Sequence, residues 1–211
     1  QDCVVYQIAL IILGTIAIIA NYYFGIFPEN SLLKKLVFIG YLINLSVIVI
    51  LFIVAFNKRG NKLLLNFAIK VGAKLHLIKN KEAFLNRSNQ IISEFHDSAL
   101  LLMNSKWHFI KVIIINLFAL SLLYLVPFTL IMGLGEYLNP LVVIVASAYV
   151  MLMGSFVPLP GGTGGLEFGF VRFFGFYIIG AKLSSIMITW RLLTYYLGLI
   201  VGAISLNKKE G

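Results

Sequence analysis

Four stretches of the chain are almost free of charge, and each is long enough to cross a bilayer. The first is Val4–Phe27, with 24 residues, and the second is Leu36–Phe56, with 21. The third is Val112–Gly135, and the last is Leu183–Leu206, which holds one arginine. Since about 20 apolar residues in a helix span roughly 30 Å of hydrocarbon, the pattern predicts four transmembrane helices. The short turn after Phe27 joins the first two as an antiparallel hairpin over residues 4–56.

Residues 57–111 show a different pattern, in which polar and apolar positions alternate with helical spacing. Lys or Asn recurs every four residues over 62–80, opposite an apolar face, and a second such helix is expected over about 82–104. Amphipathic helices of this kind lie in the membrane interface. The segment also holds ten of the seventeen Lys and Arg residues. Because basic residues gather in cytoplasmic loops, we place residues 57–111 in the cytoplasm, together with the C-terminus.

Residues 137–181 are apolar but are broken by prolines and glycines. The first helical part is about Leu141–Val157, and a second apolar part follows from Phe168 to Ala181. Either both parts cross the membrane, or both enter it and return to the same side. The charge pattern fits both topologies. Seventeen residues at about 1.5 Å each are short for a full span, so segment length favours a re-entrant pair within the bundle 112–206.

Composition restricts the class of protein. Apolar residues make up 60% of the 211 residues and charged residues only 12%, whereas a soluble domain carries about 25% charged residues. A soluble enzyme is therefore excluded, and the continuous apolar runs exclude a β-barrel. We expect an all-α, polytopic helical membrane protein that forms one transmembrane domain over residues 1–211.

The break between the two parts of residues 137–181 is the segment most suited to binding. Prolines lack a backbone N–H and glycines favour non-helical backbone, and hydrocarbon tolerates such a segment only where protein or water covers it. Glycine N–H groups at the start of a helix also form a natural anion site. The alternative is an ordinary turn between two full spans. The candidate lipid-binding residues here are Pro158, Pro160, Gly161, Gly162, Gly164 and Gly165.

Three charged residues near this break are expected to lie within the membrane. They are Glu167, Arg172 and Arg191, and each costs roughly 2.5–3.5 kcal/mol at a helix centre, so they should be paired or hydrated. Glu167 would pair with either arginine. Tyr195 lies four residues after Arg191, on the same helix face, and would orient its guanidinium. The set is either a structural ion pair or a binding site for a lipid headgroup, and the two roles are compatible.

No catalytic residue, metal ion or cofactor is expected. His96, Asp97 and Ser98 are consecutive, so they do not face one another on a helix. His76 and His108 have no metal-ligand companions at useful spacing, and the single cysteine excludes a CxxC site. The net charge of +9 is explained by membrane topology, so we expect no nucleic-acid binding by this segment.

Two motifs resemble one known family. Val157-Pro-Leu-Pro-Gly-Gly-Thr-Gly-Gly-Leu-Glu167 resembles the PxPGGxGxxE signature of the lysylphosphatidylglycerol synthase transmembrane-region family, the flippase-like domain of MprF-type proteins. Trp190–Gly198 resembles that family's closing helix, with its pattern Arg-Leu-x-x-Tyr-Tyr-x-Gly. Asp2–Gln7 and Ser93–Ser98 fit weaker patterns. The resemblance implies lipid translocation in a bacterial plasma membrane, with anionic or aminoacylated phospholipids as partners, and a link to antibiotic resistance.

The departures from the family pattern limit what the resemblance implies. The family begins with further transmembrane helices, so a chain that starts at Gln1 is expected to be N-terminally truncated. Bifunctional members also carry a soluble lysyltransferase domain, which these residues lack, so the resemblance leaves enzyme activity open. The alternatives are the membrane part of a phosphatidylglycerol lysyltransferase or a small-solute transporter. Residues 57–111 would then dock a partner enzyme or a second copy of the chain.

Overall fold

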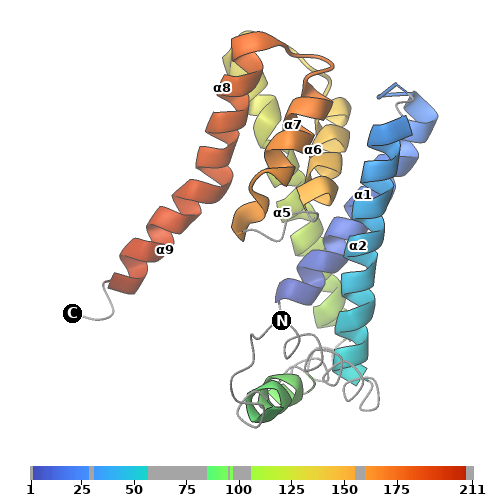
Figure 1. The fold of residues 1–211 in the computed structure, drawn as a ribbon, viewed down its shortest axis with the longest axis vertical. Helices are drawn as coiled ribbons and strands as arrows, with labels where there is room; N and C mark the ends of the chain where they lie inside the picture. The colour runs from blue at the N-terminus through green and yellow to red at the C-terminus, as the bar shows by residue number, and fades with distance from the viewer. Residues whose placement is uncertain are drawn as a thin grey trace, which may run out of the picture. The chain divides into compact units, whose positions relative to one another are not determined.

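The computed structural model describes residues 2–28, 31–56, 85–94, 96, 106–154 and 160–207. Its first long helices are α1 (Asp2–Phe24), α2 (Ser31–Phe56) and α5 (Lys106–Gly133). The last long helix is made of α8 (Gly180–Arg191), the π-helix η2 (Leu192–Tyr196) and α9 (Leu197–Asn207) (Figure 1). No strand occurs in the described ranges.

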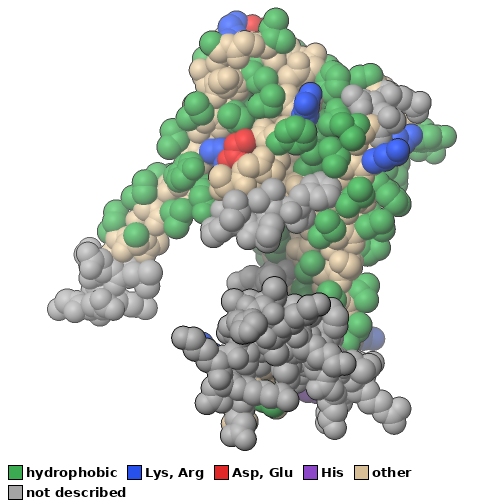
Figure 2. Space-filling view, viewed as in Figure 1, with side chains coloured by type: hydrophobic (Ala, Val, Ile, Leu, Met, Phe, Trp, Pro, Cys, Tyr) green, Lys and Arg blue, Asp and Glu red, His purple; other side chains and the backbone are tan. Residues whose placement is uncertain are grey.

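Four helices are long and apolar enough to cross a membrane, as the sequence predicts. They are Val4–Phe24, Leu32–Val54, Lys106–Gly133 and Gly180–Ser205. Lys106 and Trp107, which the sequence places at the boundary of the third span, form the first turn of α5. Hydrophobic side chains cover much of the described surface in Figure 2, as contact with lipid requires. The expectation of an all-α, polytopic membrane protein is confirmed.

The chain divides by its contacts into two compact units. The larger unit consists of Ala9–Asn44 and Leu117–Gly211 and holds every candidate site residue; the smaller consists of Gln1–Ile8 and Leu45–Asn116. The amphipathic helix expected over 62–80 lies outside the described residues. Within the second one, expected over 82–104, residues 85–94 are helical.

The broken apolar segment of the larger unit folds as a helical hairpin. Its arms are α6 (Pro140–Gly154, 15 residues) and α7 (Gly165–Phe174, 10 residues), which lie side by side in Figure 1. A Cβ on Gly154 would meet Leu166, and one on Gly169 would meet Val150, so the arms run antiparallel. At about 1.5 Å per residue, each of these two helices is shorter than the roughly 30 Å of hydrocarbon that a full span crosses.

Aromatic and aliphatic residues of α7 hold the hairpin in the core of this unit. Phe170, Phe173 and Phe174 are fully buried, at spacings of three and four residues that place them on one face of α7. The Phe173 ring lies 5.2 Å from the rings of both Phe27 and Tyr149, so the turn after α1 meets α6 and α7 there. The opposite face of α7 carries Arg172, which is exposed.

Two glycines allow helices to approach α6 and α7 closely. A Cβ on Gly40 would lie 2.4 Å from the backbone oxygen of Leu152, and one on Gly154 would lie 2.5 Å from the Leu166 side chain. At Gly40 the obstacle is backbone, which cannot move aside, so this position of α2 requires glycine; at Gly154 the end of the Leu166 side chain would have to shift. The contacts bring α2 and the start of α7 against the end of α6, next to the tip of the hairpin, residues 160–164.

Candidate functional site

Arg191 is buried near the middle of a membrane span. It is residue 12 of the 26-residue span Gly180–Ser205, and its side chain is 6% exposed. An arginine at such a depth costs roughly 2.5–3.5 kcal/mol on insertion scales unless partners compensate. The surrounding residues must therefore satisfy its charge and its N–H groups.

The tip of the hairpin and the first turn of α7 supply those partners. Nε of Arg191 lies 2.7 Å from Oε1 of Glu167, although the N–H does not point along that line, so the contact is an ion pair and not an aligned hydrogen bond. Nη1 donates to the backbone oxygen of Gly161 at 3.0 Å, and Nη2 donates to Oγ1 of Thr163 at 3.3 Å. Of the two arginines that the sequence offers as partners for Glu167, the structure selects Arg191.

Glu167 also holds the start of α7 in place. Its Oε2 accepts a hydrogen bond of 2.6 Å from the backbone N–H of Gly164, three residues earlier. This carboxylate satisfies a donor that the first turn of a helix leaves unpaired, and its charge is favourable at the helix N-terminus. The anion site that the sequence predicts at this helix start is thus occupied by the protein's own carboxylate.

Glycine is required in the tip for conformational reasons. Gly161, Gly162 and Gly164 have φ angles of +72°, +63° and +91°, which side-chain-bearing residues rarely adopt. A Cβ on Gly161 would also lie 2.4 Å from Cε2 of Tyr195. The tip can therefore rest against the Tyr195 ring only where Gly161 stands.

Tyr195 contacts Arg191 as the sequence predicts, but the backbone between the two residues is a π-helix, which the sequence does not predict. The guanidinium carbon lies 5.0 Å from the centre of the Tyr195 ring, within the range of a cation–π contact. Arg191 directly precedes the π-helix Leu192–Tyr196, and Tyr195 lies within it. Such turns are rare and often occur at functional sites. The sequence gives no signal for the π-helix, since no proline or glycine lies within it.

The remaining candidates have separate positions. Gly162 packs against Leu166, Gly165 is buried at the start of α7, and Pro160 begins the short 3-10 turn at the tip. Pro158 lies outside the described residues. Arg172 does not join the cluster: its guanidinium lies over the Phe168 ring, 5.1 Å from the centroid, and it lines a different cavity.

Two contributors to the site were not singled out from the sequence. Thr163 accepts from Arg191, and the Trp190 ring stacks on Phe170 at 5.0 Å, which fixes the last span against α7. Thr163 lies within the proline- and glycine-rich motif Val157–Glu167, and this position was the sequence signal that could have identified it as a site residue. Trp190 directly precedes Arg191, but only the packed structure shows what its ring contacts.

A second ion pair lies away from the hairpin tip. Nζ of Lys182, on α8, contacts Oε1 of Glu136, in the connection between α5 and α6. Both side chains are about half exposed, at 54% and 45%. Exposed pairs of this kind contribute little, about 0–1 kcal/mol. In Figure 2 opposite charges touch on a surface that is otherwise largely apolar.

The fold and the site together define a class: a multi-pass helical membrane protein in which a broken hairpin supplies partners to a buried arginine of the last span. The family model described as the lysylphosphatidylglycerol synthase TM region matches residues 2–202. The chain belongs to this family. Searches of curated proteins and of solved structures found no match to the chain.

Proposed function

We propose that this membrane domain moves a phospholipid, including an aminoacylated one, between the two leaflets. The observation that carries the proposal is Arg191, a buried cation near the middle of a span, whose hydrogen bonds and ion pair are made by the hairpin tip and the first turn of α7. A headgroup crossing the bilayer needs such a polar site halfway. The family description, which names lysylphosphatidylglycerol, supports a lipid as the ligand.

The chemistry of the site suggests an exchange of partners. A lipid phosphate would replace the Glu167 carboxylate on Arg191, because guanidinium groups bind phosphate with two parallel hydrogen bonds. The freed Glu167 would then need a cation, since an unpaired buried charge is costly. An amine on the same headgroup meets that need, so a lysyl lipid leaves both charges of the site compensated.

The orientation follows from the distribution of basic residues. Residues 57–111 and the C-terminus would face the cytoplasm. The end of the hairpin away from its tip, where α6 begins and α7 ends, would lie in the opposite leaflet. The family and this topology favour a bacterial plasma membrane. Residues 57–111 would offer a surface for a partner enzyme or a second copy of the chain.

The test is a leaflet assay of the full chain in liposomes that contain fluorescent lysyl-phosphatidylglycerol. Glu167→Gln and Arg191→Lys should each slow translocation about tenfold or more, because each removes one half of the exchange. Glu136→Gln, which alters the exposed ion pair, is the matched control and should translocate at the normal rate. Unchanged translocation in both site variants would contradict the proposed exchange.

A second candidate function follows from the word synthase in the family description. The domain would then present phosphatidylglycerol to a lysyltransferase and would not itself move lipid. Deletion in the native host separates the two: loss of total lysyl lipid favours presentation, whereas lysyl lipid retained in the inner leaflet favours translocation. A small-solute transporter would change neither.

A further inference from the structure

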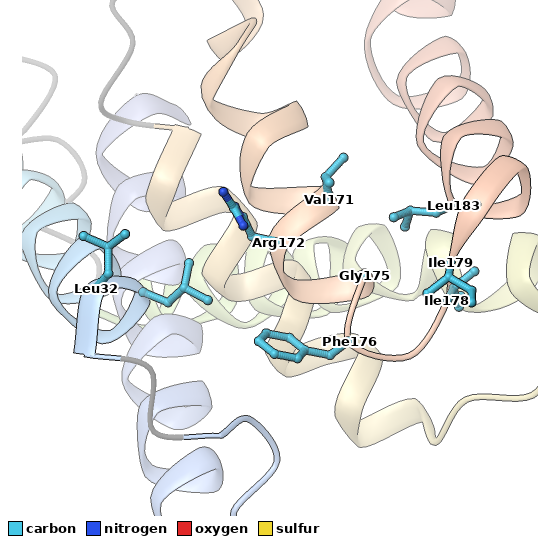
Figure 3. A pocket seen from close by; sticks show the side chains of 10 residues that line it. Leu32, Val171, Arg172, Gly175, Phe176, Ile178, Ile179 and Leu183 are labelled. Atoms are coloured by element: carbon cyan, nitrogen blue, oxygen red, sulfur yellow. The ribbon is translucent and has the colours of Figure 1, made fainter.

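Arg172 marks a second polar position, on the face of α7 turned away from the hairpin core. It lines a cavity of about 450 Å³ between the first turn of α2, the end of α7 and the start of α8. Figure 3 shows Leu32 of α2 on one side of Arg172 and Val171 and Leu183 on the other. The volume lies within the range of ligand pockets, about 300–1,000 Å³.

Among the lining residues that the structure describes, Arg172 is the one that carries a charge. The other side chains are leucine, isoleucine, valine and phenylalanine, together with two glycines. In the part of the chain that the structure describes, no carboxylate forms an ion pair with Arg172, in contrast to Arg191 and Lys182. A lone cation in an apolar wall is complementary to a ligand with one negative group and a hydrocarbon body.

The cavity lies at the end of the unit where lipid headgroups are expected. The Tyr177 hydroxyl, in the connection from α7 to α8, donates to the backbone oxygen of Ile26, just after α1. Tyr22 and Tyr23 at the end of α1 are 82% and 77% exposed. Exposed tyrosines of this kind gather at the membrane–water interface. Arg172 lies five residues before Tyr177 in the chain, so its guanidinium is near this end of the unit and within reach of a phosphate.

We infer that this cavity is a binding site for an anionic phospholipid of the adjacent leaflet, with the phosphate on Arg172 and an acyl chain along the apolar wall. Because no acidic side chain is found among the described residues that line the cavity, the site binds by phosphate charge and does not select an amine on the headgroup. It is separate from the Arg191 site. Lipid binding here does not require translocation, so the two proposals fail independently.

The test is photo-crosslinking of the full chain in nanodiscs with a phosphatidylglycerol that carries a diazirine on its acyl chain. Mass spectrometry should locate adducts on residues 171–183. Arg172→Gln should reduce these adducts about tenfold, as expected for loss of a charged hydrogen bond, and Arg172→Lys should retain most of them. Lys35→Gln, an exposed cation on α2 outside the cavity, is the matched control and should leave them unchanged.

A second variant tests the cavity apart from its charge. Val171→Trp places a bulky ring in the cavity without altering charge, at an exposed position that tolerates the change, and should also reduce the adducts. Equal adducts in wild type and Arg172→Gln would overturn the inference, as would full crosslinking in Val171→Trp. Equal labelling by a diacylglycerol probe, which lacks the phosphate, would overturn the role of the phosphate, and competition by millimolar glycerol phosphate would show a site for soluble anions instead.

Discussion

Gly161 packs directly against the side-chain ring of Tyr195, and the space between them is too small for a methyl group. A Cβ on Gly161 would lie 2.4 Å from Cε2 and from Cζ of the Tyr195 ring, while the Gly161 carbonyl accepts a hydrogen bond from Arg191. One glycine thus joins the hairpin tip to two residues of the last span. A movement of Gly161 away from Arg191 would therefore also change its contact with the Tyr195 ring.

Gly161→Ala should therefore disrupt the tip. The substituted residue would have to hold a φ of +72° and displace an aromatic ring, and the first effect alone costs about 1–3 kcal/mol. We expect a lower thermal unfolding midpoint in detergent and faster proteolysis near the tip. Gly198→Ala is the control: nothing lies within 4 Å of a Cβ there, and alanine favours a helix. Equal midpoints for the two variants would show that the tip does not rest on Tyr195.

The two ion pairs of the larger unit should differ in strength. The pair of Arg191 and Glu167 is mostly buried, at 6% and 26% exposure, and breaking such a pair costs several kcal/mol. A double-mutant cycle with Arg191→Gln and Glu167→Gln should give a coupling free energy of about 1–3 kcal/mol. The same cycle on Lys182 and Glu136 should give less than about 1 kcal/mol. Chemical unfolding in mixed micelles measures both coupling free energies. Equal values would contradict the greater burial of the Arg191–Glu167 pair.

The sequence was sufficient for the spans and for the charged residues of the site, but not for their pairing. Charge-free runs of 21 and 24 residues determine a membrane helix almost by themselves. Glu167 and Arg172 are five residues apart on one helix, so at 100° per residue they point about 140° apart; helical geometry alone disfavoured that pair. The pairing with Arg191 depends on contacts between residues far apart in the sequence.

The π-helix and the hydrogen bond between Gly164 and Glu167 could not be predicted from the sequence, for a different reason. Whether Gly164 offers its N–H to a ligand or to Glu167 depends on a difference of a few ångströms in where the tip stands. The close approach of α2 to α6 at Gly40 and the stack of Trp190 on Phe170 set that position. Both are packing effects, which local sequence patterns do not report.

Gly40→Ala should weaken the contact between α2 and α6. A Cβ there would lie 2.4 Å from the Leu152 carbonyl oxygen, and backbone cannot move as a flexible side chain can. We expect a loss of about 1–3 kcal/mol in unfolding free energy, as for overpacked cores. Gly202→Ala, where nothing lies within 4 Å of a Cβ, should be neutral or slightly stabilising. Wild-type stability in Gly40→Ala would show that the helices lie further apart.

The two tryptophans provide an optical test of the packing around Arg191. Trp190 is 2% exposed and stacked on Phe170, whereas Trp107 is 76% exposed at the start of α5. In Trp107→Phe, the fluorescence of Trp190 should resist quenching by both acrylamide and brominated lipids. In Trp190→Phe, Trp107 should be quenched readily by at least one of the two, because its side chain is mostly exposed. If a lysyl lipid displaces the hairpin tip from Arg191, its addition should increase quenching of Trp190, and Glu167→Gln should show that increase without the lipid. Quenching of Trp190 that matches Trp107 in the lipid-free protein would mean that the last span does not pack on α7.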